Sequence, residues 1–286
     1  MNHGLLGLLG QETTYPNVYN PQLLFPIPRK NNREALGLNQ NNLPFYGQDT
    51  WHHYEVSWLK NNGVPEVAIA RIVLPCESLF LIESKSMKLY FNSLNMAKFD
   101  SREQVLDLII KDLSEAAKVP VQVEFLSVEI LPEILPEISQ KFSFGKPIGE
   151  CLDNLNIDIK DYEINKDLLK IDLEKKSHES LYSNLFRSRC PVTSQPDWAA
   201  INIIYKGPKI IKESLLAYLI SYREHMGFHE DCVERIFIDL YQIASWDELT
   251  VMGYFTRRGG LDINPVRILK TSENNKLVKP IRLFRQ

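Results

Sequence analysis

The chain has 286 residues, of which 33 are basic and 36 acidic, for a net charge of −3, and 44% are hydrophobic. This composition is typical of a soluble globular protein with material for a full core, in one large domain or two of ordinary size. It excludes a global positive field that would attract nucleic acid, and no uninterrupted apolar stretch approaches the length of a membrane span.

The cysteines indicate the redox compartment. Cys76, Cys151, Cys190 and Cys232 are widely spaced and form no Cys-x-x-Cys pair. We therefore expect a reducing, cytoplasmic environment rather than a disulfide framework. The apolar run over residues 1–9 has no preceding basic region and is interrupted by glycines, so we do not expect it to act as a signal peptide.

The first half of the chain begins with an arm and continues with regular elements. Residues 1–50 are rich in Asn, Pro and Gly but carry large apolar side chains, which predicts an irregular arm lying on the body. The segments that follow alternate in type: strands over 51–59 and 66–74 around an Asn61-Asn-Gly63 hairpin turn, an amphipathic helix over 101–117 that Ser101 opens, and a strand over 119–128.

The second half repeats this alternation after residues 131–166, which are loop-rich and acidic and predict a linker. The expected elements are strand-like segments over 168–173, 178–188 and 198–205, a helical stretch over 211–221, an amphipathic helix over 230–244, and a last strand over 250–256. Sliding one half along the other aligns Ser86 with Ser214, Tyr90 with Tyr218, and Val105 with Val233. We infer a duplicated unit and an α+β fold, with antiparallel sheets covered by helices on one face.

One stretch suggests covalent chemistry: Phe186-Arg-Ser-Arg-Cys190-Pro-Val-Thr-Ser-Gln-Pro-Asp197-Trp198. Flanking arginines favour a thiolate, the reactive form of cysteine. The prolines stiffen the loop, so that the carboxylate of Asp197 is expected near the sulfur, as covalent catalysis requires. The plainer interpretation is a chance cysteine in a surface loop.

Two further clusters accompany it. The segment Glu83-Ser-Lys85-Ser-Met-Lys88 places two lysines on one face of a helix start, where they could hold phosphates, although such lysines are usually a solvated face. The segment Gly227-Phe-His229-Glu230-Asp precedes a helix and suits proton transfer, although an acidic capping turn with an incidental histidine is the plainer interpretation.

Together these stretches resemble one family. Residues 83–90, 190–198 and 227–231, with Tyr254-Phe-Thr-Arg257-Arg258-Gly-Gly-Leu-Asp-Ile-Asn-Pro265, are similar to the signatures of the NADPH-dependent 7-cyano-7-deazaguanine reductases. These are the nitrile reductases of queuosine biosynthesis, a tRNA-modification pathway. The similarity extends over nearly the whole chain and matches the longer, duplicated form of the family.

The resemblance implies a fold, a partner and a reaction. The fold is a tandem of tunnelling-fold (T-fold) units, which we place at residues 1–145 and 146–286, and the chains pair into homodimers. The reaction is a four-electron reduction of a small-molecule deazaguanine nitrile to a primary amine with two NADPH, and it needs no metal. Because the motifs lie in different halves, we expect the site to assemble across units or subunits.

The resemblance also implies residue roles. Cys190 attacks the nitrile and forms a covalent thioimide, Asp197 is the general acid/base, and His229 binds substrate and delivers a proton. The remaining assignments concern binding: Glu83, Ser84, Phe228, His229 and Glu230 for substrate, and Ser84, Lys85, Lys88, Arg257 and Arg258 for NADPH. No Gly-x-Gly-x-x-Gly fingerprint follows a strand, so we do not expect Rossmann-type cofactor binding.

Three other interpretations remain. The spacing of His225, His229 and Cys232 would suit a zinc hydrolase of the cyclohydrolase type, although Gly227 interrupts the helix they would need. A purine- or pterin-binding module without catalysis is a second alternative, against which the intact Cys190 and Asp197 count. A cysteine hydrolase would leave the lysines unexplained.

Overall fold

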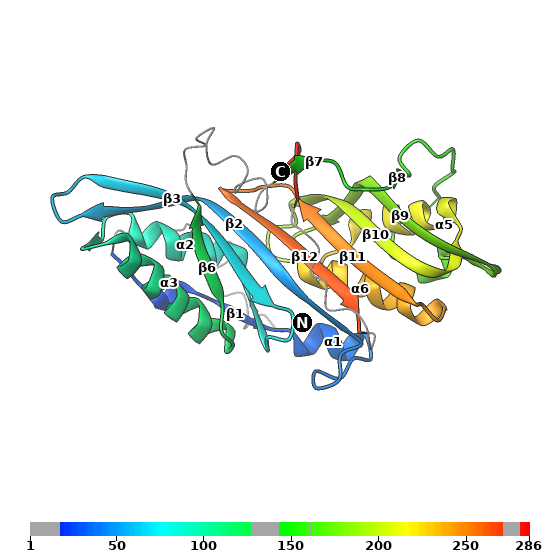
Figure 1. Ribbon diagram of the computed structural model, residues 1–286, viewed down its shortest axis with the longest axis horizontal. Coiled ribbons are helices and arrows are strands. Elements are labelled where there is room, and N and C mark those ends of the chain that lie inside the picture. Colours follow the sequence, from blue (N-terminus) through cyan, green and yellow to red (C-terminus); the bar gives the residue numbers. More distant parts are fainter. Residues whose placement is uncertain (1–17, 127–142, 161, 271–280) are drawn as a thin grey trace.

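The computed structural model describes residues 18–126, 143–160, 162–270 and 281–286. In this part of the chain a single large sheet carries the long helices on one face, and most of its pairings are antiparallel (Figure 1). This confirms the α+β prediction. The strands of the sheet, in spatial order, are β6 (Gln122–Leu126), β3 (Pro65–Pro75), β2 (Phe45–Lys60), β12 (Leu261–Leu269), β11 (Glu248–Phe255), β10 (Pro196–Ile210), β9 (Ile171–Arg189) and β8 (Glu150–Cys151), with β5 (Lys98–Phe99) pairing with β2. The exceptions to the antiparallel pairing in this sheet are β2–β5 and β8–β9.

Four helices cover the sheet, two in each half: α2 (Ser84–Leu94), α3 (Arg102–Ala117), α5 (Lys212–Ile220) and α6 (His229–Ile243). Smaller elements complete the described part: α1 (Lys30–Ala35), β1 (Pro26–Pro28), β4 (Phe80–Ile82), β7 (Ser143–Gly145), β13 (Ile281–Leu283) and the 3-10 turns η2 (Pro21–Leu23), η4 (Lys166–Leu168) and η5 (Ser221–Glu224). No helix within the described ranges is long and apolar enough to cross a membrane.

Local sequence explains the first half well. Gly63 adopts φ +83° in the turn between β2 and β3, a conformation that costs glycine little. The Ser101 side chain accepts a hydrogen bond from the backbone N–H of Gln104 and begins α3, and Lys118 ends that helix in the left-handed region. The apolar face of α3, including Val105, is fully buried on the sheet. The predicted hairpin and helix are therefore confirmed.

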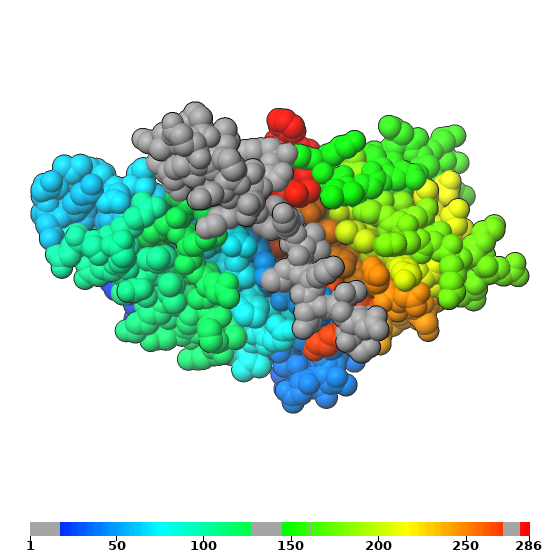
Figure 2. Space-filling view, in the orientation of Figure 1, coloured from blue at the N-terminus to red at the C-terminus, as the bar shows by residue number. Residues whose placement is uncertain are grey.

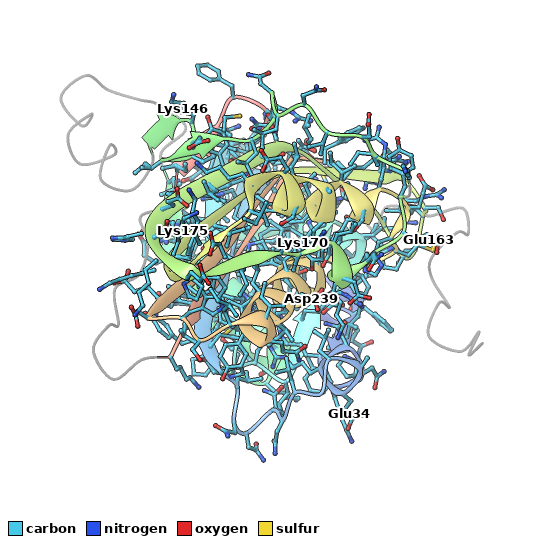
Figure 3. All side chains as sticks on the ribbon, turned by 90° about the vertical axis from the view of Figure 1, so that its right-hand side faces the viewer. Glu34, Lys146, Glu163, Lys170, Lys175 and Asp239 are labelled. Atoms are coloured by element: carbon cyan, nitrogen blue, oxygen red, sulfur yellow. The ribbon has the colours of Figure 1, made fainter. Side chains whose placement is uncertain are left out.

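The two halves are related by an internal repeat. Tyr90 donates a hydrogen bond to Asp112 at 2.7 Å, and Tyr218 donates one to Asp239 at 2.6 Å. The hydroxyl groups of Ser86 in α2 and Ser214 in α5 each accept a 3.0 Å bond from the backbone N–H of a preceding segment, at Phe25 and Lys170 respectively. Figure 3 faces the second half and labels Lys170 and Asp239. The repeated hydrogen bonds support the inferred duplication beyond the thin sequence identity.

A strand from the end of the chain joins the halves. Strand β12 pairs with β2 from Leu261 opposite His53 to Leu269 opposite Phe45. A side chain at Gly47 would collide with the backbone oxygen of Val266, so glycine permits this close pairing. The halves consequently lie side by side along the long axis of the molecule (Figure 2).

The structure has two main hydrophobic cores, and each extends across the β2–β12 pairing that joins the halves. One cluster is drawn mainly from residues 152–269 but includes Phe45 and Cys76, and the other is drawn from residues 24–123 together with Leu261 and Ile263. Each core therefore contains residues of the other half. The division at residue 145 remains our proposal for the boundary.

Three expectations require correction. The arm is regular in its described part, because residues 30–35 form α1 and residues 45–50 begin β2. The two strand-like segments over 168–173 and 178–188 belong mainly to one strand, β9, whose pairing with β10 contains two register shifts. The linker lies partly outside the described residues, and its described part includes β7 and β8.

Candidate active site

A cavity of about 190 Å³ lies where the two halves meet. Its floor includes Trp51 of β2 and Ile263 of β12, the strands that join the halves. It collects every predicted site residue except Arg257: Glu83, Ser84, Lys85, Lys88, Cys190, Asp197, Phe228, His229, Glu230 and Arg258. Both halves of one chain therefore contribute to this pocket.

The nucleophile candidate and its carboxylate flank one tight turn. Cys190 directly follows β9, and Asp197 is the second residue of β10, opposite Ser188. The backbone N–H of Cys190 bonds to the oxygen of Gln195 at 2.9 Å, and Ser194 closes the turn with φ +57°. Backbone pairing thus fixes both side chains at the same end of the sheet, as the stiff loop predicted.

Asp197 is 4% exposed and lies between two donors. Its Oδ2 is 3.3 Å from Nε2 of His229, and its Oδ1 accepts a hydrogen bond from Arg258. Burial acts to raise the pKa of Asp197, but the bonds to His229 and Arg258 outweigh it and hold that pKa below the ordinary value. In this arrangement Asp197 is an ionised carboxylate, ready to accept a proton.

The arginines beside Cys190 share one acidic partner. Arg187 and Arg189 both pair with Glu224, at 3.3 and 2.7 Å, and this single carboxylate balances only one of their two charges. The cations that line the pocket with Cys190 are instead Lys85, Lys88 and Arg258. Stabilisation of a thiolate by the flanking arginines therefore remains a prediction, and the pocket adds positive charge of its own.

The start of α6 projects three groups into the cavity. Phe228 is its N-cap, and the ring of His229 stacks on Phe255 at 3.9 Å between centroids. This stacking fixes the imidazole edge toward Asp197. Glu230 is 2% exposed, and its Oε1 has no hydrogen-bond partner within the described residues. Burial raises the pKa of Glu230 to about 7, which leaves a carboxyl group awaiting a donor.

Glu83 caps the opposite helix. Its carboxylate accepts hydrogen bonds from the backbone N–H groups of Lys85 and Ser86, at 2.9 and 2.7 Å, at the start of α2. The side chain is 2% exposed and so has a fixed direction. The Oε1 atom also accepts a 3.5 Å bond from the Ser84 hydroxyl, whereas Oε2 retains a lone pair, so the cap leaves Glu83 able to accept a further bond.

The lysines and arginines of the pocket suit an anionic ligand. Lys85 and Lys88 form no salt bridge within the described residues. Burial and the neighbouring Arg258 lower the pKa of Lys88, and a nearby anion would reverse that penalty. These free cations at a cavity wall fit phosphate groups of a cofactor. Arg257 lies elsewhere, with its guanidinium 4.4 Å from the ring centre of Tyr54, so its assignment to cofactor remains a prediction.

The groups considered for zinc do not converge in the described part of the chain, where no three His, Cys, Asp or Glu side chains are arranged as a metal site. His225 and Cys232 lie against Gly227, whereas His229 turns to Asp197. Burial lowers the pKa of His225 to about 4.

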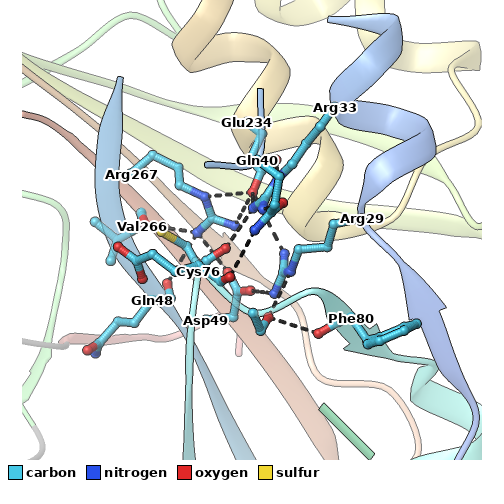
Figure 4. Close-up of polar contacts among 12 residues, drawn as sticks. Arg29, Arg33, Gln40, Gln48, Asp49, Cys76, Phe80, Glu234, Val266 and Arg267 are labelled. Carbon is cyan, nitrogen blue, oxygen red and sulfur yellow. Dashed lines mark hydrogen bonds and ion pairs between the residues drawn. The ribbon is translucent and has the colours of Figure 1, made fainter. Parts of the chain in front are cut away.

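Sequence reasoning missed a buried ionic cluster behind the pocket. It consists of Arg29, Arg33, Asp49, Glu234 and Arg267, each at most 1% exposed (Figure 4). Two features of the sequence could have indicated this cluster. Arg29 ends an apolar, proline-rich segment, and Glu234 lies one helical turn after Glu230 and so on the same face of the helix.

Family comparisons agree with the pocket. Residues 15–125 match the family model described as "Nitrile reductase, 7-cyano-7-deazaguanine-reductase N-term", and residues 196–274 match that of "QueF-like protein".

Three curated relatives named "NADPH-dependent 7-cyano-7-deazaguanine reductase" are similar over nearly their full lengths. The chain is 47% identical to that of Chromohalobacter salexigens over 281 residues, covering 97% of this chain and 96% of the relative. It is 48% identical over 284 residues to that of Acinetobacter baumannii strain SDF and 46% identical over 285 residues to that of Acinetobacter baylyi, covering 98% of both chains in each case.

Proposed function

The chain belongs to the 7-cyano-7-deazaguanine reductase family of nitrile reductases, and we propose that its pocket reduces the nitrile of 7-cyano-7-deazaguanine to an aminomethyl group with NADPH. The observation that carries this proposal is the convergence of Cys190, Asp197 and His229 on one cavity that also holds two buried carboxyl groups. A product of this kind would enter the queuosine modification of tRNA.

Covalent capture of the nitrile begins at Cys190. Its sulfur bonds to the nitrile carbon, one carbon–nitrogen π bond breaks, and the nitrogen takes up the proton that the thiol has lost. Asp197 is suited to carry that proton, because its pKa is held low and it starts ionised. His229, 3.3 Å away, stabilises the carboxylate and steadies its direction. The resulting thioimide has a polarised carbon that accepts hydride far better than a nitrile.

Recognition of the base depends on carboxylates. The aminopyrimidone edge of a deazaguanine presents N–H donors, and an ionised carboxylate is the matching acceptor. Glu230 has an unused buried oxygen, and Glu83 has lone pairs left after capping α2. Phe228 lines the same wall and offers a flat apolar surface to the ring. Analogues without these donors would leave buried carboxyl groups unpaired and would be rejected.

The cofactor would be held by the cations of the pocket. Lys85 and Lys88 present free ammonium groups for phosphates, and Arg258 is a third candidate once it leaves Asp197. Each NADPH, when bound, would supply one of the two hydrides of the reduction. Trp51 and Ile263 form an apolar floor that excludes water from the reacting carbon.

Spectrophotometry tests the proposal directly. Addition of 7-cyano-7-deazaguanine should oxidise two NADPH per nitrile, measured as the loss of reduced nicotinamide absorbance. Intact mass spectrometry without NADPH should find a covalent adduct that the Cys190→Ala variant does not form. Nitrile binding without NADPH consumption would instead favour a non-catalytic purine-binding module, and activity that chelators abolish would favour a zinc enzyme.

We also propose a homodimer. Along β10 and β11 side chains alternate between faces, and Ala200, Met252 and Tyr254 form a small apolar cluster with Leu283, apart from the two main cores. Each of these side chains is at most 6% exposed in the single chain, so the cluster is already covered, and the homodimer is proposed from the resemblance to the duplicated form of the family. Sedimentation equilibrium should find twice the mass of one chain, and a monomer at micromolar concentration would contradict the proposal.

A further inference from the structure

The buried cluster behind the pocket carries an unbalanced charge. Three guanidinium groups, of Arg29, Arg33 and Arg267, face two carboxylates, of Asp49 and Glu234 (Figure 4). The distances are those of direct pairs: Arg29 Nη2 to Asp49 Oδ2 2.5 Å, Arg267 Nη1 to Asp49 Oδ1 2.8 Å, Arg33 Nη2 to Glu234 Oε1 2.7 Å, and Arg267 Nη2 to Glu234 Oε1 2.8 Å. One positive charge is left over.

Water does not screen that surplus. Every member of the cluster is at most 1% exposed. A surplus charge so far from water is costly unless another charge compensates it. The structure therefore needs one more negative group beside the cluster.

Two carboxyl groups at the start of α6, those of Glu230 and Asp231, interact with the arginines of the cluster, and Glu230 is the one that lines the pocket. It lies one turn before Glu234 on α6, so that the two side chains share a face of the helix. Its Oε1 and the Nη1 of Arg29 are both buried and make no hydrogen bond within the described residues, although Arg29 Nη1 lies 3.7 Å from Glu234 Oε1 as an ion pair. Each acts on the other electrostatically: Arg29 favours the ionised form of Glu230, and Asp49 opposes it.

We propose that Arg29 is a positioning residue for the substrate pocket. Together with the surplus positive charge of its cluster, Arg29 stabilises the ionised form of Glu230, which is the form that binds the substrate. The inference rests on the proposed function, because it assumes a ligand with N–H donors. Arg29 does not touch the ligand; it acts through Glu230.

Other charged groups also face Glu230 and set the balance. Asp49 approaches from β2 and raises the pKa of Glu230, whereas His229 on the same helix and Arg29 beside α1 lower it, against a larger rise from burial. Glu83 and the pocket cations lie across the cavity. Asp231 also faces the cluster, and burial raises its pKa to about 7, but it does not line the pocket.

The test is a carboxyl titration of the full chain, labelled with ¹³C only in glutamate, so that Asp231 is absent from the spectrum. The Glu230 signal is identified by its loss in Glu230→Gln. Arg29→Gln should raise the pKa of Glu230 by about one pH unit or more, as expected for loss of a close opposite charge. Asp49→Asn should lower it. The double variant restores the surplus and should return the pKa to near its starting value.

A matched control removes a charge elsewhere. Arg71 pairs with Glu124 at 2.9 Å on the β3–β6 edge, and Arg71→Gln should leave the Glu230 titration unchanged. An unchanged pKa of Glu230 in folded Arg29→Gln would overturn the proposal, as would a double variant that fails to restore it. Should neither single variant fold, the cluster would be assigned to stability and the proposal would be wrong.

Ligand binding separates this inference from the proposed function. Calorimetry with 7-cyano-7-deazaguanine, in a Cys190→Ala background, should give about fivefold weaker binding at pH 7 for Arg29→Gln, because the competent ionised fraction falls from about half to about one tenth. Binding should recover at pH 9. A protein that binds no nitrile, while Glu230 titrates as expected, would refute the function and still support the charge coupling.

Discussion

The burial of Glu230 predicts that this residue weakens the fold in order to bind substrate. Its pKa lies near 7, against an ordinary value of 4.5, because burial disfavours the charged carboxylate. A carboxyl group whose pKa is raised by folding destabilises the native state only where the unfolded chain has lost the proton. The cost is therefore absent below about pH 4.5, grows up to about pH 7 and is constant above that.

The magnitude follows from the difference between the two pKa values. About 2.5 pH units at 1.36 kcal/mol each give a cost of about 3 kcal/mol at pH 8. At pH 5.5 the unfolded chain has lost the proton but the native state retains it, and the cost is only about 1.4 kcal/mol. Glu230 is 2% exposed, so solvent screening does not reduce these values much. Glu230→Gln removes the ionisation while keeping the shape.

Urea unfolding at the two pH values tests this reasoning. The free energy of unfolding of Glu230→Gln minus that of the parent chain should be about 2 kcal/mol larger at pH 8 than at pH 5.5, because the substitution stabilises the fold more at pH 8. Comparing the two pH values cancels any pH-independent effect of the amide. A difference that does not change with pH, or that changes in the opposite sense, would refute the assignment of a raised pKa to Glu230.

Further predictions concern the reaction and the repeat. Asp197→Asn should keep the fold, by circular dichroism, but lower kcat by about 10²-fold or more, as for a lost acid/base, and near-normal turnover would reassign that role. Lys85→Ala should raise the KM for NADPH more than that for the nitrile, and a pure effect on the nitrile would count against a phosphate contact. Tyr218→Phe leaves buried Asp239 without its hydrogen-bond donor, and the free energy of unfolding measured in urea should fall by about 1–3 kcal/mol. An unchanged midpoint would show that this hydrogen bond does not stabilise the fold.

Short-range patterns predicted much of the fold. Ser101 and the Asn61-Asn-Gly63 turn are local signals, and the structure has a helix and a hairpin where they indicate them. The turn that brings Cys190 and Asp197 to one pocket was also indicated by the local sequence, because the two residues are separated by a single turn. Such features depend on neighbours in the chain, and the sequence displays those directly.

Long-range pairing could not be predicted in the same way. Arg187 and Arg189 share the carboxylate of Glu224, a partner that the local sequence around Cys190 does not indicate. Likewise, Arg33 of α1 donates a hydrogen bond to Glu234 of α6, and the local sequence of neither helix indicates that the two residues pair. Strand β12 was missed since Pro265 lies within it, and proline usually argues against a central strand.

The pairing of β12 with β2 has a consequence for synthesis. Until residues 261–269 leave the ribosome, the backbone N–H and C=O groups of β2 that pair with β12 have no partner strand. The core of the first half also lacks Leu261 and Ile263 until then. Unpaired edges invite contact with other chains. A nascent or truncated polypeptide that ends before this strand would therefore be prone to aggregation. The first half is protected only when β12, near the end of the chain, has been translated and has paired with β2.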